Sequence, residues 1–124
     1  MTLDISTMIG KTMASVTGKP GDEEMVFVSA DGWKFRFYHQ QGCCEEVAVN
    51  DVTGDISDLI GSPITQAETS SNEDNSYERD EYGSCTWTFY KFATNKGSVT
   101  VRWLGESSGD YSEEVDLDVT PPTA

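Results

Sequence analysis

The densest group of side chains that can do chemistry lies at residues 39–45. It holds the one histidine of the chain, His39, two adjacent thiols, Cys43 and Cys44, and the carboxylate of Glu45. A zinc site needs about four such ligands, usually with spaced cysteines, so we expect no metal site here. A Cys–His nucleophile pair is the enzymatic alternative, because such partners meet in space rather than in sequence. We favour a plainer interpretation, in which both cysteines are small buried apolar residues and His39 makes a local hydrogen bond.

Three aspartates, Asp51, Asp55 and Asp58, suggest a calcium site, but their spacing does not match the alternating EF-hand loop with its terminal glutamate. We assign them instead to solvated faces and to a helix cap. Residues 54–61 have apolar side chains at helical spacing, which predicts a short helix with Asp55 as its N-terminal cap and Gly61 as its stop.

The strongest structural signal is residues 85–104, where two runs of β-branched and aromatic residues are joined at Asn95-Lys96-Gly97. This pattern predicts a β-hairpin. With a two-residue turn at Asn95-Lys96, the expected cross-strand pairs are Thr94 with Gly97, Phe92 with Val99, Tyr90 with Val101 and Thr88 with Trp103. Because side chains alternate across a strand, these residues form one mostly apolar face, which we expect to be the core.

The other face of this hairpin sets Arg102 opposite Phe89 and Lys91 opposite Thr100. A cation beside an aromatic ring on a half-exposed sheet can hold an anionic or nucleotide-like ligand. We therefore name Phe89, Lys91 and Arg102 as ligand-binding candidates, with Arg36 as a further cation for a phosphate. The alternative is an ordinary cross-strand packing pair.

The chain has 124 residues and a net charge of −14, from 22 acidic and 8 basic side chains. This balance argues against general binding to nucleic acid or to an anionic membrane, because both need a basic surface. The acidic surface could imitate nucleic acid and so bind a basic protein, or it could simply keep the protein soluble. The odd count of three cysteines does not indicate a disulfide framework. No apolar run is long enough for a membrane span, and residues 1–12 lack a signal-peptide pattern, so we expect a cytoplasmic protein without cofactors.

The remaining chain is mostly strand-like. We expect strands at residues 8–16, 24–29, 33–39, 43–52, 64–69 and 111–119, with a turn at Asp31-Gly32. In the strand at 43–52, Val47, Val49 and Asp51 would share a face. Residues 70–83 are acidic and polar, which predicts an exposed loop.

The expected fold is mainly β, and α+β at most: two antiparallel β-meanders joined by a crossover with one short helix. We expect a single domain over residues 1–124, with a core at about 8–119 and a tail at 120–124. Exposed edge strands make a homo-oligomer plausible.

The chain also resembles a family of small uncharacterised phage and prophage proteins over nearly its whole length. The segments that carry the resemblance are Tyr38-His39, Cys43-Cys44-Glu45, Gly54-Asp55, residues 58–64, residues 86–91, residues 94–100, Arg102-Trp103 and Tyr111-Ser112-Glu113. The family has no established catalytic residues to transfer. The resemblance implies a phage-encoded accessory protein made in the host cytoplasm, and small phage proteins of this kind often blunt host defence.

Three classes of function follow. A non-enzymatic binding protein, our leading hypothesis, would sequester a nucleotide signal or cover a basic host protein. A small enzyme would use His39, Cys43 and Glu45. A minor structural protein of the virion would assemble into particles.

Overall fold

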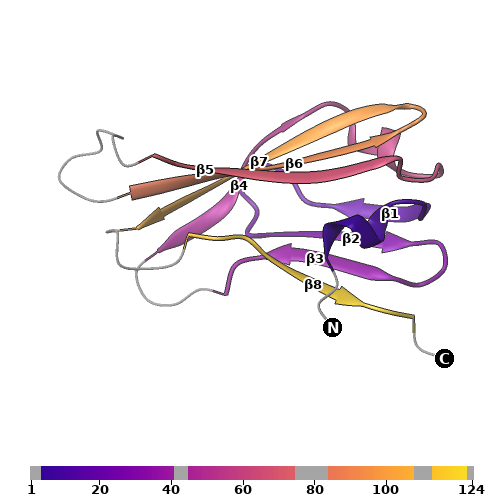
Figure 1. Cartoon of the computed structure of the whole chain (residues 1–124), viewed down its shortest axis with the longest axis horizontal. Helices are drawn as coiled ribbons and strands as arrows, with labels where there is room; N and C mark the ends of the chain where they lie inside the picture. The colour runs from indigo at the N-terminus through magenta and orange to yellow at the C-terminus, as the bar shows by residue number, and fades with distance from the viewer. Residues whose placement is uncertain (1–3, 41–44, 75–83, 108–112, 123–124) are drawn as a thin grey trace.

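The computed structural model describes residues 4–40, 45–74, 84–107 and 113–122. The expectation of a mainly β, antiparallel fold is confirmed. Two four-stranded antiparallel sheets lie one above the other as two layers (Figure 1), and the described part of the chain begins and ends beside the first sheet.

The first sheet contains β1 (Met13–Thr17), β2 (Glu24–Ser29), β3 (Lys34–Tyr38) and β8 (Asp116–Thr120), in the order β1-β2-β3-β8. Strict alternation along β2 and β3 turns the side chains of Met25, Phe27, Phe35 and Phe37 into the core. The Asp31-Gly32 turn between these strands is confirmed, and Gly32 takes a φ of 96° that a residue without a Cβ adopts readily.

The second sheet contains β4 (Glu46–Thr53), β5 (Gln66–Asp74), β6 (Ser84–Thr94) and β7 (Gly97–Ser107), in the order β4-β7-β6-β5. All four cross-strand pairs expected for the β6–β7 hairpin are confirmed. The apolar face of the hairpin is buried, as expected, from Thr88 to Trp103.

The expectation that Asp51 shares a face with Val47 and Val49 is wrong. A β-bulge lies between Val49, which pairs with Trp103, and Asp51, which pairs with Arg102. The extra residue is Asn50, and it shifts the alternation so that Asp51 is exposed. Without the bulge, the sheet would carry the Asp51 carboxylate toward the core, where an unpaired charge is costly.

Among the described residues, two short 3-10 helices flank the strands, η1 (Ile5–Met8) and η2 (Ile56–Leu59). η2 is the expected short helix, and Asp55 caps it by accepting a hydrogen bond from the Ser57 backbone N–H. Hydrogen bonds from the Ser57 side chain and then its backbone lower the pKa of Asp55. η1 was not expected: the first strand begins at Met13 rather than at Met8.

Two further expectations are corrected. Residues 70–74 belong to β5, which runs to Asp74, and are not part of a loop; residues 75–83 lie outside the described residues. The last strand, β8, does not extend the second meander but returns to the first sheet and pairs with β3. Tyr111, expected in this strand, also lies outside the described residues.

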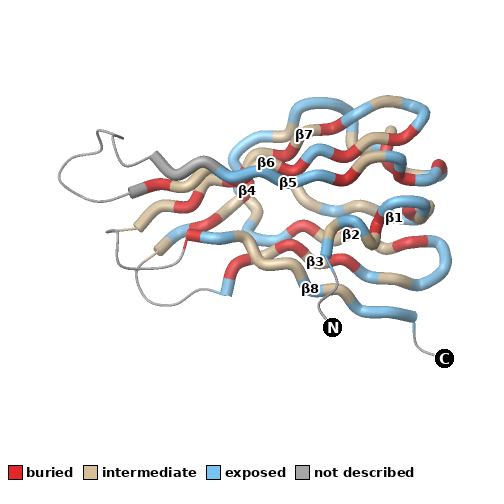
Figure 2. The backbone as a smooth tube through the Cα atoms, viewed as in Figure 1, coloured by how far each residue is buried: buried red, intermediate tan, exposed pale blue. Residues whose placement is uncertain are grey.

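The core lies between the two sheets, where buried residues alternate with more exposed ones along β2, β3 and β7 (Figure 2). Aromatic rings join the layers: the centroids of Phe27 and Phe92 are 4.8 Å apart, as are those of Phe37 and Tyr90. Offset and edge-to-face pairs of this kind add to the apolar burial, so they fix how the sheets face each other. Each sheet therefore keeps one outer face.

Candidate binding surface

The outer face of the second sheet carries a half-buried group of Trp87 and Phe89 from β6 with Arg102 and Leu104 from β7, which we call the aromatic face. These residues lie in adjacent cross-strand pairs, Trp87 with Leu104 and Phe89 with Arg102. The register that buries the hairpin's apolar side leaves them on the other side of the sheet. Sequence alternation alone therefore placed Phe89 and Arg102 correctly as neighbours.

The Arg102 side chain is held in a defined position on this face. Its Nε and Nη2 atoms donate hydrogen bonds to Asn50 Oδ1, at 2.9 and 2.6 Å. Its guanidinium carbon lies 5.0 Å from the centre of the Trp87 ring, within the range of a cation–π contact. No pattern in the sequence pointed to Asn50, because its position depends on the bulge in β4.

Carboxylates surround the aromatic face. Asp51 lies opposite Arg102, Glu68 opposite Lys91, and Glu46 opposite Glu106. Glu46, Asp51 and Glu68 are exposed. The predicted cations Lys91 and Arg102 thus each have an acidic cross-strand neighbour, which weakens any local positive potential.

Arg36 does not join this group. It lies on β3 between the buried residues Phe35 and Phe37, so it belongs to the outer face of the first sheet, on the other side of the core. Its Nε donates to Glu24 Oε2 at 2.5 Å, and its guanidinium carbon lies 4.0 Å from the centre of the Tyr38 ring. The hydrogen bond to Glu24 raises the pKa of Arg36. The structure therefore brings together Phe89, Lys91 and Arg102 but not Arg36.

The predicted reactive cluster is only partly described, since Cys43 and Cys44 lie outside the described residues. His39 and Glu45 do meet: Nε2 lies 2.8 Å from Glu45 Oε2, and both side chains are almost fully buried. The other ring nitrogen, Nδ1, lies 2.7 Å from the Glu114 carbonyl oxygen.

A carbonyl oxygen only accepts, so Nδ1 carries a hydrogen and donates it. One proton must then lie between Nε2 and Oε2, on the ring or on the carboxyl group. Both ring nitrogens of His39 are thus engaged, by Glu114 and Glu45. These hydrogen bonds connect the end of β3 to the segments before β4 and β8. A structural role therefore fits His39 better than the role of a general base.

A second buried carboxylate, Glu113, was not anticipated. Its Oε1 accepts a hydrogen bond of 2.7 Å from the Thr86 hydroxyl, and its Oε2 accepts one from the Ser107 hydroxyl. The Glu113 backbone passes directly over Gly105, at a distance that leaves no room for a Cβ. Gly105, the glycine inside β7 rather than at its start, was the one available signal for this close approach.

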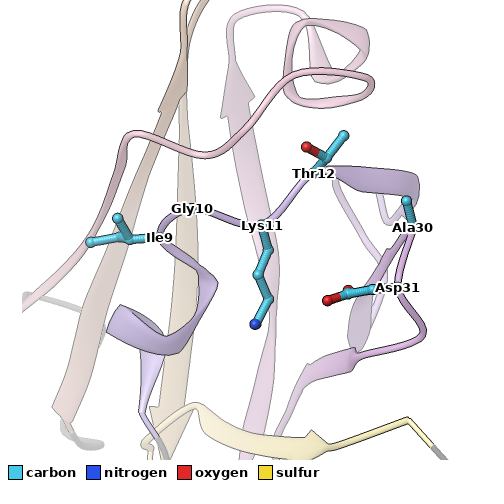
Figure 3. Close-up of a pocket in the computed structure, with 6 residues that line it drawn as sticks. All are labelled: Ile9, Gly10, Lys11, Thr12, Ala30 and Asp31. Carbon is cyan, nitrogen blue, oxygen red and sulfur yellow. The ribbon is translucent and has the colours of Figure 1, made fainter.

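An open hollow of about 390 Å³ lies beside the turn that joins β2 and β3 (Figure 3), lined by Ile9, Gly10, Lys11, Thr12, Ala30 and Asp31. The Lys11 ammonium group lies 4.4 Å from the centre of the Trp33 ring. Among the described residues, no three His, Cys, Asp or Glu side chains gather closely enough to hold a metal ion.

Comparison with known protein families gives a match across residues 6–117, to a domain of unknown function, DUF7448. The chain belongs to the DUF7448 family. The match covers both sheets of the fold, from η1 into β8. No curated protein and no solved structure gave a significant match. In the part of this DUF7448 chain that the structure describes, no helix has the length and apolar character needed to cross a membrane.

Proposed function

We propose that this protein is a phage-encoded accessory protein that acts in the host cytoplasm by binding, without catalysis, a basic surface of a host protein. The aromatic face is the proposed contact surface. The single observation that carries the proposal is the combination of Trp87, Phe89, Leu104 and a fixed Arg102 on one open sheet face with carboxylates around them.

Trp and Arg are among the residue types that contribute most to protein–protein affinity, above all near the centre of an interface. Here both lie on the central strands β6 and β7, and Arg102 is already oriented by Asn50. Because its position is set before binding, less side-chain entropy is lost on association. The surrounding acids, with the net charge of −14, would attract a basic partner and speed its association.

A nucleotide signal is the second candidate, supported by the cross-strand pairing of Phe89 with Arg102. The acids Asp51 and Glu68 oppose it, because a phosphate placed beside Arg102 or Lys91 would lie near a carboxylate. The proposal therefore favours a protein partner over a small anion.

The test is site-specific photocrosslinking in infected cells. A benzoylphenylalanine placed at Phe89 should crosslink a basic host protein, whereas the same group at Val26, on the outer face of the first sheet, should not. With the purified partner, Arg102→Ala should weaken binding by about 30-fold, as expected for a central interface arginine, and Arg36→Ala by less than about twofold.

Three outcomes would contradict this proposal. Equal crosslinking from both positions would mean that the aromatic face is not the contact surface. If the crosslinked partner has no basic surface, electrostatic attraction by the acidic residues around the aromatic face cannot explain the binding. A nucleotide adduct in native mass spectrometry that disappears in Arg102→Ala would replace the protein partner with a small ligand.

A further inference from the structure

The four edge strands of the two sheets differ in how their outer edges are protected. Unpaired backbone groups along an edge are a template for another strand, and proteins usually block them. On β4, the N–H and C=O groups of Val49 bond to Asp22 and Gly21. On the β1 side, Thr12 bridges Pro63 and Met13 bridges Ile60.

The edge strand β8 is protected differently. It has five residues, and Pro121 and Pro122 follow it directly. A short strand that ends in prolines offers few donors to a second chain.

The fourth edge, β5, contacts the 3-10 helix η1, but among the described residues no backbone group pairs with its outer side. It is nine residues long, about 30 Å, and its one partner strand is β6. The Gly10 N–H bonds to Ile64 O just before the strand begins, but no backbone hydrogen bond from any other described element reaches Gln66–Asp74. Residues 68–71 are exposed, and β5 contains no proline and no lysine.

The charge of β5 selects what can pair with it. The strand contains Glu68, Glu73 and Asp74 and no basic residue. A second copy of the chain would therefore bring acid against acid, whereas a basic strand would bring opposite charges into cross-strand positions.

From these observations we propose that β5 binds an extended basic segment of the partner by strand addition, which makes the second sheet five-stranded. This inference rests on the proposed function and names the part of the partner involved. Backbone hydrogen bonds to β5 would supply affinity, and lysine or arginine side chains near Glu68 would supply selectivity. The added strand would extend the sheet that carries the aromatic face, so both contacts could be made by one partner.

The test is amide hydrogen exchange, measured by NMR on the whole protein, with a twelve-residue peptide of alternating lysine and valine. At saturating peptide, the outward-pointing amides within residues 68–71 should exchange at least about tenfold more slowly, as expected when exposed amides enter a ladder. A peptide with proline in place of every valine has the same charge but cannot pair, and should leave these amides unchanged.

Variants sharpen the result. Glu68→Lys should weaken peptide binding by at least about threefold, whereas Glu23→Lys, an equal change of charge at an exposed site off the second sheet, should have a smaller effect. Ser70→Pro and Ser71→Pro form a second pair. Alternate backbone N–H groups of β5 point away from β6, so one of these two substitutions removes an outward-pointing donor and the other removes a donor to β6. The variant that keeps the wild-type Tm is the one that lost the outward donor. In that variant the peptide should no longer slow the exchange of the β5 amides.

Equal protection by the proline peptide, or binding with no slowing in β5, would overturn strand addition. Slowing that grows with protein concentration alone would assign the edge to a second copy and would also overturn it. If the lysine–valine peptide shifts the Trp87 and Phe89 resonances but not β5 exchange, strand addition fails while the proposed function stands. If β5 is protected but the crosslinks at Phe89 fail, the proposed function fails instead.

Discussion

Arg102 on β7 and Asn50, the extra residue of the bulge in β4, are joined by two hydrogen bonds to one amide oxygen. The bulge thus has two effects at once. It keeps Asp51 out of the core, and it places an acceptor where the guanidinium group lies beside the Trp87 ring. A local irregularity of an edge strand therefore positions the central cation of the candidate binding surface.

Asn50→Ala should release Arg102 without unfolding the protein. The loss of two partly exposed hydrogen bonds should lower the free energy of unfolding by about 1 kcal/mol or less. The NMR signal of the Arg102 Nε–H group should then exchange faster with water. Asn50→Asp is the matched control, because it keeps an acceptor at this position, and its signal should remain protected. Equal exchange rates in the wild type and Asn50→Ala would contradict the assigned role.

Gly105→Ala should destabilise the fold strongly. A Cβ at this position would lie 2.5 Å from the Glu113 carbonyl oxygen, and backbone atoms cannot move aside easily. We expect a loss of about 2 kcal/mol or more in urea unfolding. Gly97→Ala, at the start of the same strand, is the control: its Cβ meets the end of the Asp58 side chain, which can rotate away. Similar losses in both variants would exclude the close approach as the cause.

His39→Leu should cost about 3 kcal/mol or more, because it leaves the buried Glu45 carboxyl group without its histidine partner. Glu45→Gln should cost less, since an amide can still hydrogen-bond to the ring. The double variant His39→Leu with Glu45→Leu should be more stable than the sum of the single losses predicts. Chemical denaturation of His39→Leu, Glu45→Leu and the double variant measures this coupling, and strictly additive losses would argue against a direct pair.

Trp103→Phe should be mild for a core substitution. Trp103 is among the largest fully buried side chains, but its indole N–H has no hydrogen-bond partner within the described residues. The replacement loses packing and also removes a buried donor that costs about 1–3 kcal/mol when unsatisfied. We expect a net loss below about 2 kcal/mol, against about 3–5 kcal/mol for Trp103→Ala. A loss in Trp103→Phe as large as that in Trp103→Ala would mean that the indole N–H is satisfied.

Tyr90 should make the stability fall at high pH. Burial raises the pKa of Tyr90 to about 12, from an ordinary value of 10.0. The folded state therefore keeps the phenol proton that the unfolded chain releases. This contribution is fully present below pH 10 and is lost as the pH rises toward 12, which amounts to about 2–3 kcal/mol.

Urea unfolding at several values from pH 8 to 12 measures the Tyr90 effect. In Tyr90→Phe, the fall in stability over this range should be smaller by about the same 2–3 kcal/mol, because the remaining tyrosines and lysines still titrate. An identical pH dependence in both proteins would contradict the burial of the Tyr90 hydroxyl.

Much of the fold could be predicted from the sequence because its determinants are local. The alternation of apolar residues and the Asn95-Lys96 turn together specify the register of the β6–β7 hairpin, since each face must be either buried or exposed. The same alternation placed Phe89 beside Arg102. The cap at Asp55 follows equally from residues within one turn of it.

Residues 70–74 show where such reasoning fails. Their polar side chains predict a loop, but this segment is a strand because its backbone pairs with β6 while residues 70 and 71 remain exposed. A sheet edge satisfies backbone groups without requiring apolar side chains, so hydropathy does not reveal it.

The sequence by itself thus determined the β class, the central hairpin and one half of the candidate surface. Only the tertiary structure decided that β8 joins the first sheet, that Asn50 bulges toward Arg102, that Arg36 lies on the opposite outer face, and that His39 meets Glu45 and Glu114. These relationships join segments far apart in the chain. They depend on how two sheets pack around one core, and no local pattern of residues encodes that packing.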